Sequence, residues 1–184
     1  MQAQGRHADY DPSAWFYDRH WGGFSRQVLP VLERLVLGEL PAGARILDLC
    51  CGTGHLAALL TERGFRVVGV DVSAGMLAFA RVHAPQADFV LADARDFALP
   101  EAVDAAVSLY DSLNHILALD ELARVFVNVR RVLVPGGAGP SDALGPGADV
   151  LRRHRPHDEV AAADAGADGR GRVAPTKRAP TTAT

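Results

Sequence analysis

Short apolar runs alternate with amphipathic segments from residue 44 to residue 133, and this alternation is the main structural signal in the chain. The apolar runs have the length and the aliphatic content of buried strands, and they fall at 44–50, 65–71, 87–93 and 103–110. Between and after them, apolar residues recur at helical spacing in 55–64, 74–83 and 120–133. Strands that alternate with helices over short connections predict an α/β fold with a parallel sheet covered on both faces.

Local signals mark the ends of several of these helices. Gly64 is placed to end the first helix, and Ser73 is a suitable N-cap for the second. Upstream, residues 28–40 form another amphipathic pattern, which we expect to become helical at Pro30, since the first turn needs no N–H from that position. Residues 10–24 are dense in aromatic side chains and less regular.

The composition changes abruptly near Gly137. Every tryptophan, tyrosine and phenylalanine precedes it, and residues 138–184 contain no isoleucine or methionine. Such a segment buries too little apolar surface to offset the entropy of ordering, so we expect a low-complexity, disordered tail, read from a shifted frame or added as an extension. The sheet is then truncated after four or five strands. This divides the chain into a helical cap or lid region (1–43), a core (44–137) and the tail.

Length, charge and cysteine content exclude several classes of protein. The 184 residues, 48% of them hydrophobic, suit one core rather than two. A net charge of −3 without a basic cluster argues against nucleic-acid binding. The absence of a long apolar run or a leader predicts a soluble cytoplasmic protein with no membrane partner. Cys50 and Cys51 are adjacent, which suits neither a disulfide framework nor a zinc site, so no metal is expected.

The stretch DLCCGTGHLA, residues 48–57, carries the candidate chemistry. Gly52 and Gly54 fit a glycine-rich loop that lets a ligand approach the backbone at a helix N-terminus. Asp71 ends the next strand, where its carboxylate could accept both hydroxyls of a ribose. These features serve a nicotinamide dinucleotide and S-adenosylmethionine equally. Asp48 favours the second, because an acid there would face the positive amino and sulfonium groups, and Asp93 could bind an adenine amino group.

With these residues in place, the chain resembles the class I S-adenosylmethionine-dependent methyltransferases. ILDLCCGTGHLAALL is similar to the family's first motif, VVGVDVSAGMLAFAR to its second, ADARDF to its adenine-binding motif and RRVLVPGG to the turn before its fifth strand. The resemblance implies a Rossmann-like, doubly wound parallel sheet with S-adenosylmethionine as cofactor. It also implies cofactor-binding roles for eight residues. The methionine part would be bound by Asp48, Gly52 and Gly54, the ribose by Asp71, and the adenine by Met76, Asp93 and Ala94. The aromatic residue that closes over the cofactor would be Tyr17.

The acceptor side follows the fourth predicted strand, in LYDSLNHI, residues 109–116. The family places methyl-acceptor contacts there, so the resemblance implies that Tyr110 and Asn114 contact substrate. The segment is similar to a version found in methyltransferases that act on small molecules, and it is not the motif of enzymes that methylate the amino group of a base. Methyl transfer needs a general base only for a protonated, weakly acidic acceptor, and His115 is the candidate for that role.

Three functions remain open. The first is a methyltransferase that acts on a small-molecule acceptor. The second is an NAD-dependent oxidoreductase, which only the loop GTGHLA supports. The third is a truncated, inactive methyltransferase that keeps the binding residues on a weakened scaffold.

Overall fold

The structure is a computed structural model, and it describes residues 11–138 and 148–151. The helices are α1 (Ala14–Leu35), α2 (His55–Glu62), α3 (Ala74–His83) and α4 (Leu119–Val132), with short 3-10 turns η1 (Asp11–Ser13), η2 (Leu37–Glu39) and η3 (Ser112–His115). The strands are β1 (Arg45–Leu49), β2 (Arg66–Asp71), β3 (Asp88–Leu91), β4 (Val103–Leu109), β5 (Leu133–Ala138) and β6 (Ala148–Leu151). The expected alternation of strands and helices between 44 and 133 is confirmed.

The sheet runs in the order β3-β2-β1-β4-β5, and these five strands are parallel. Every residue of β1 is buried, as expected for a central strand covered on both faces. The chain first builds outward from β1 to β3 and then returns to the other side of β1 with β4. This reversal between β1 and β4 creates the crevice at which open α/β sheets bind ligands.

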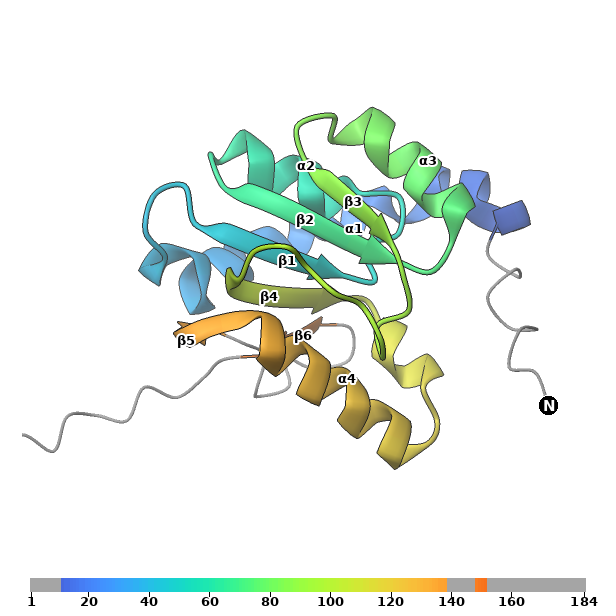
Figure 1. The fold of residues 1–184 in the computed structure, drawn as a ribbon. Coiled ribbons are helices and arrows are strands. Elements are labelled where there is room, and N and C mark those ends of the chain that lie inside the picture. The colour runs from blue at the N-terminus through green and yellow to red at the C-terminus, as the bar shows by residue number, and fades with distance from the viewer. Residues whose placement is uncertain (1–10, 139–147, 152–184) are drawn as a thin grey trace, which may run out of the picture.

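Helices cover the two faces of the sheet unequally (Figure 1). On one face α1, α2 and α3 pack against the sheet, with Leu32, Ile46 and Leu60 fully buried among them. On the other face, within the described residues, α4 packs its Val125 and Val129 against the alternate residues of the same strands. The alternation of side chains along each strand thus supplies two separate cores.

Two expected helix ends are confirmed. The Ser73 hydroxyl accepts a hydrogen bond from the Met76 N–H at 3.1 Å, which caps α3. Gly64, just after α2, has a φ of +84°, the left-handed conformation that glycine adopts readily at a helix end.

The expected helix start at Pro30 is wrong, because α1 already begins at Ala14 and Pro30 lies inside it. The buried positions Ser25, Leu29 and Leu32 continue at helical spacing past the proline, so packing keeps the helix intact. Pro30 has no N–H group, so the Arg26 carbonyl loses its usual donor. Both residues are exposed, and water can replace that donor.

The expected sheet of four or five strands is confirmed by the five parallel strands, but the elements at its end differ from the expectation in two details. The segment LVPGGA, read as a turn before the fifth strand, is itself β5, and β6 lies within the segment assigned to the tail. β5 pairs only with the start of β4, at Val103 and Ala105 and with a shifted register. The remaining edge of β4 is therefore open, and β6 pairs with it in antiparallel orientation from Ala106 to Leu109. Residues 139–147 and 152–184 of the expected tail lie outside the described residues.

Candidate functional site

The carboxyl ends of β1 and β4 carry unusual backbone conformations. Cys50, directly after β1, has a φ of +58°, and Tyr110, directly after β4, has a φ of +61°. A side chain makes this conformation unfavourable, and the cost is accepted mainly where function or packing fixes the backbone. The two strained residues flank the point at which the strand order reverses, where the topology places a ligand.

The glycine loop after β1 combines a ligand-facing glycine and a packing glycine. Gly52 has a φ of +54°, and a Cβ added there would meet no described atom within 4 Å. Gly54 has a φ of +79°, but a Cβ there would lie 2.7 Å from the Ala80 Cα on α3. Gly52 therefore borders open space, as expected for a residue that a ligand approaches. Gly54 instead allows α2 and α3 to pack closely.

Asp48 is the most unusual polar residue of the site. It lies on β1, only 2% exposed, and its Oδ2 atom has no hydrogen-bond partner among the described residues. Burial first, and then the nearby Asp71 carboxylate, raise the pKa of Asp48 to about 8, although the Ala57 N–H donates a hydrogen bond to it. A buried acid with an unsatisfied oxygen is costly unless a ligand supplies a donor or a positive charge.

Asp71 holds the glycine loop as well as ending β2. Its Oδ2 accepts a hydrogen bond from the Gly52 N–H at 2.8 Å, and its Oδ1 accepts one from the Ser73 N–H at 2.9 Å. Burial outweighs these hydrogen bonds and raises the pKa of Asp71. Each carboxylate oxygen can accept a further hydrogen bond, so the expected ribose contact is compatible with this structural role.

Asp93 follows β3 and is paired with Arg95. The Arg95 guanidinium donates to both carboxylate oxygens, at 2.8 and 2.6 Å, and also pairs with Glu121 on α4 at 3.0 Å. The neighbouring Ala94 carbonyl accepts a hydrogen bond of 3.5 Å from the Asn128 side chain. The expected adenine-binding turn is thus fixed by charge pairs and by α4. Sequence reasoning missed Arg95, although its position two residues after Asp93 was a signal.

The N-terminal segment up to Trp21 reaches the carboxyl ends of the strands. In η1, just before α1, the Asp11 carboxylate accepts hydrogen bonds from the Ser73 hydroxyl and the Gly75 N–H, at the beginning of α3. Further along, on α1, the Trp21 carbonyl accepts a hydrogen bond of 2.7 Å from the Tyr110 hydroxyl. This segment is therefore fastened to the segments that follow β2 and β4.

Tyr17 and Met76 lie in this region. Tyr17 is half-buried on α1 and stacks on Trp21, with ring centroids 6.1 Å apart. Met76 is 4% exposed in the first turn of α3, close after Asp71. Their predicted contacts with a cofactor stay predictions.

The expected acceptor-side residues differ in exposure. Tyr110 is half-buried, its ring centroid lies 4.8 Å from that of Phe24, and burial raises the pKa of its hydroxyl, which is engaged with α1. Asn114 and His115 are exposed on η3, beyond the end of β4. All three follow the carboxyl end of β4 within six residues, and their roles toward substrate and catalysis stay predictions.

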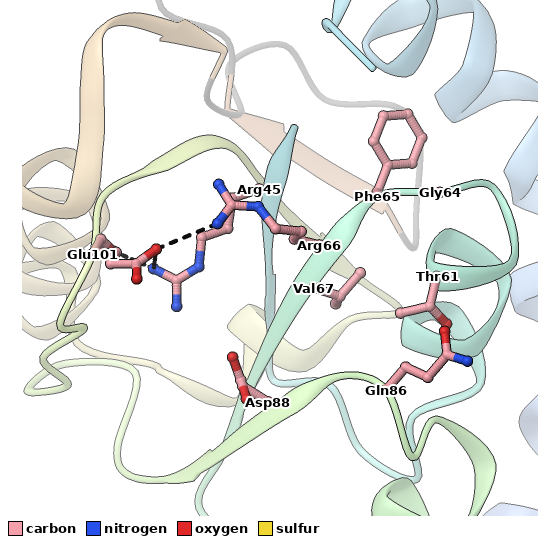
Figure 2. Close-up of a pocket in the computed structure, with 9 residues that line it drawn as sticks. All are labelled: Arg45, Thr61, Gly64, Phe65, Arg66, Val67, Gln86, Asp88 and Glu101. Carbon is pink, nitrogen blue, oxygen red and sulfur yellow. Dashed lines mark hydrogen bonds and ion pairs between the residues drawn. The ribbon is translucent and has the colours of Figure 1, made fainter. Parts of the chain in front are cut away.

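A separate hollow lies at the opposite edge of the sheet (Figure 2). Its volume is about 370 Å³, and Arg45, Arg66 and Asp88 line it at the amino ends of β1, β2 and β3. The Arg45 and Arg66 guanidinium groups both reach the Glu101 carboxylate, at 3.7 and 3.5 Å. Parallel sheets bind ligands at the carboxyl ends of their strands, so this polar hollow is not the cofactor site.

A cluster of three side chains outside the glycine loop and the strand ends was not predicted from the sequence. Asp18, His55 and His83 come from three different helices, and each offers one ligand atom within 4.8 Å of the others. Their spacing along the chain follows no short metal-binding motif, so only the fold brings them together.

The sheet order, the glycine loop and the acids at the ends of successive strands define a class I S-adenosylmethionine-dependent methyltransferase. A family described as a methyltransferase domain matches residues 46–137, half of the chain, and the chain belongs to that family. Membership implies S-adenosylmethionine as the cosubstrate. The family assignment gives the nicotinamide alternative no support.

Several methyltransferases of known name are similar to this chain. A dTDP-4-amino-2,3,4,6-tetradeoxy-D-glucose N,N-dimethyltransferase of Saccharopolyspora spinosa is 34% identical over 133 residues, 71% of this chain and 51% of that protein. A trans-aconitate 2-methyltransferase of Acidovorax sp. is 36% identical over 134 residues, 70% and 47% of the respective lengths.

Solved structures lead to the same family. The sugar N-methyltransferase KedS8 of Streptoalloteichus sp. aligns with a TM-score of 0.60 and 30% identity, over 66% of this chain and 49% of that one. The amino pentose methyltransferase CalS10 of Micromonospora echinaspora, solved with S-adenosylmethionine bound, aligns with a TM-score of 0.55 and 28% identity, over 68% and 52%. The chain thus spans about half the length of these relatives or less. Among the described helices, none has the length and apolar character to cross a membrane.

Proposed function

We propose that this chain binds S-adenosylmethionine at the carboxyl ends of β1, β2 and β3 and transfers its methyl group to a small-molecule acceptor. The observation that carries the proposal is Asp48, whose buried Oδ2 atom lacks a partner among the described residues beside the glycine loop. An ammonium group supplies both the hydrogen-bond donor and the positive charge that this carboxylate needs. S-adenosylmethionine carries such a group, and the nicotinamide part of a dinucleotide does not.

The remaining residues suit the other parts of the same molecule. Asp71 has acceptor capacity left for the ribose hydroxyls, and Gly52 leaves the backbone open to close approach. The turn that holds Asp93 and Ala94 lies at the end of β3, where the adenine edge is expected. Met76, packed at the start of α3, supplies an apolar surface for the ring.

Bound S-adenosylmethionine supplies an electrophilic methyl carbon on a sulfonium, so the protein has mainly to position the acceptor in line with it. Hydrogen bonds from Tyr110 to the Trp21 carbonyl and to the Ser25 hydroxyl on α1 hold the start of the predicted acceptor segment in place. His115, exposed after β4, is our candidate for removing a proton from the acceptor.

An amino sugar is the first acceptor class to test. Relatives that match this chain in sequence and in fold are named as sugar N-methyltransferases, and they support a nitrogen acceptor on a small polar molecule. The relative named as a trans-aconitate 2-methyltransferase makes a small carboxylic acid the comparison substrate.

The test is formation of S-adenosylhomocysteine by the full chain, supplied with S-adenosylmethionine and with amino-sugar nucleotides or small carboxylic acids. We expect acceptor-dependent product with wild type and with His20→Gln, an exposed α1 variant, and far less with Asp71→Ala. Binding of the product S-adenosylhomocysteine without turnover on any acceptor would leave the inactive alternative standing. Quenching of tryptophan fluorescence by NADH but not by S-adenosylhomocysteine would overturn the proposal altogether.

A further inference from the structure

Asp18, His55 and His83 meet where three helices pack together. Asp18 lies in the first half of α1, His55 is the first residue of α2, and His83 is the last residue of α3. Both Nε2 atoms converge on the same oxygen, Oδ1 of Asp18, at 3.0 Å from His55 and 2.7 Å from His83. The two imidazole centroids are 4.4 Å apart. Their side chains are 22 to 31% exposed, so the cluster is sheltered but open to solvent.

We propose that these three residues bind a divalent transition-metal ion of the zinc type, which ties the N-terminal helix to the core. Two imidazoles and one carboxylate are a donor set that suits zinc, cobalt or ferrous iron, whereas magnesium and calcium prefer oxygen ligands alone. Three protein ligands leave a fourth position for water. The site is distinct from the residues proposed above to hold S-adenosylmethionine, and it does not depend on that function.

Binding a metal ion would require only small movements of the three side chains. Ligand atoms bound tetrahedrally at about 2.1 Å from a zinc ion lie about 3.4 Å from one another. The described ligand atoms are already within 4.8 Å of one another, and the two Asp18 distances are shorter than the tetrahedral separation by well under 1 Å. Each imidazole would bind through Nε2 and keep its proton on Nδ1.

Gly22 provides an independent indication that the His55 ring is held in place. A Cβ added to Gly22 would lie 2.5 Å from the His55 Nε2 atom, so the helix backbone closes directly over the ligand atom. Any larger residue at this position must displace the ring. Gly22→Ala therefore tests the site without removing a ligand.

The experiment uses the full chain without a histidine tag, stripped with a chelator and then dialysed against Zn²⁺ or Co²⁺. We expect close to one metal ion per chain by elemental analysis, and a visible Co²⁺ spectrum typical of a four-coordinate site. At a zinc concentration a hundredfold above the Kd, mass action contributes about 2.7 kcal/mol, which is roughly 5–10 °C in Tm.

Matched variants separate this site from adventitious binding. His55→Gln and His83→Gln each remove one ligand and should abolish uptake and the Tm shift, and Gly22→Ala should weaken both. His20→Gln, an exposed histidine on the same helix outside the cluster, should bind metal as wild type does. A double Cys50→Ser, Cys51→Ser variant should also retain the ion. Each variant is first shown to unfold cooperatively in chelator.

Two outcomes would overturn the proposal. One is the absence of stoichiometric metal uptake by a folded chain, which would leave an Asp–His hydrogen-bonded cluster. The other is equal uptake by His55→Gln, His83→Gln and wild type, which would place the metal elsewhere.

Discussion

Replacement of Asp48 by asparagine should stabilise the folded chain at neutral pH and weaken cofactor binding at the same time. The carboxyl group of Asp48 is buried beside a second acid, which raises its pKa from 3.8 to about 8. In the unfolded chain it ionises near pH 4, so between pH 4 and pH 8 the native state binds one proton more than the unfolded state. The free energy of unfolding therefore falls as pH rises through this window, and this group has no further effect above it.

The magnitude follows from that window. Between 3.8 and pH 7, at about 1.4 kcal/mol per pH unit, the native protein loses about 4 kcal/mol of stability because Asp48 must stay protonated. Asparagine cannot ionise and avoids this loss. Its amide N–H group would, however, occupy the position where Oδ2 lacks a partner, at a cost of about 1–3 kcal/mol. Asp48→Asn should thus be about 1–3 kcal/mol more stable at pH 7 and less stable than wild type at pH 4.

Urea unfolding of both proteins at pH 4, 5, 6 and 7 measures the free energy of unfolding of each and shows at which pH the two are equally stable. Binding of S-adenosylhomocysteine to the variant should weaken at least tenfold, because a charged hydrogen bond worth about 1.5–3 kcal/mol is lost. A stability difference that does not change with pH would refute the assigned burial of Asp48. Unchanged affinity would refute its contact with the amino group.

Three further changes test separate parts of the site. Asp71→Ala should weaken S-adenosylhomocysteine binding at least tenfold in a titration, since it removes the proposed ribose acceptor and the anchor of the Gly52 N–H; a folded variant with wild-type affinity would rule out this placement. Gly54→Ala should lower the Tm measurably, because its Cβ meets Ala80 at 2.7 Å; normal melting together with normal binding would contradict the packing described. His115→Ala should lower kcat by about 100-fold or more and leave the affinity for S-adenosylhomocysteine unchanged, and an unchanged kcat would exclude a general base here.

Much of the fold could be predicted because its signals are local. Four strands and the helices α2, α3 and α4 follow from hydrophobic periodicity and from caps such as Ser73. The start of α1 could not be found this way, because Pro30 is a strong local signal for the first turn of a helix, which burial of Leu29 and Leu32 overrides. β6 was missed for a related reason, since its pairing depends on an open edge of β4 that only the tertiary structure reveals.

The candidate site, like the fold, could be predicted from the sequence only in part. The positions of Asp48, Asp71 and the glycine loop follow from strand ends and spacing, and the structure places them together at the reversal point. The electrostatic state of these acids and of Asp93 could not be predicted from the sequence. The unsatisfied oxygen of Asp48 and the pairing of Asp93 with an arginine both depend on how the folded chain packs. The cluster around Asp18 was inaccessible to sequence reasoning, since its members lie on three helices far apart in the chain.

Calorimetric titration of the full chain with S-adenosylhomocysteine at pH 7, repeated in buffers of different ionisation enthalpy, shows directly whether the product binds at Asp48. We expect one binding site per chain and the release of close to one proton on binding, because the cationic amino group favours the ionised form of Asp48. The release should vanish in Asp48→Asn. The absence of binding to a chain that unfolds cooperatively would refute the proposed cofactor site.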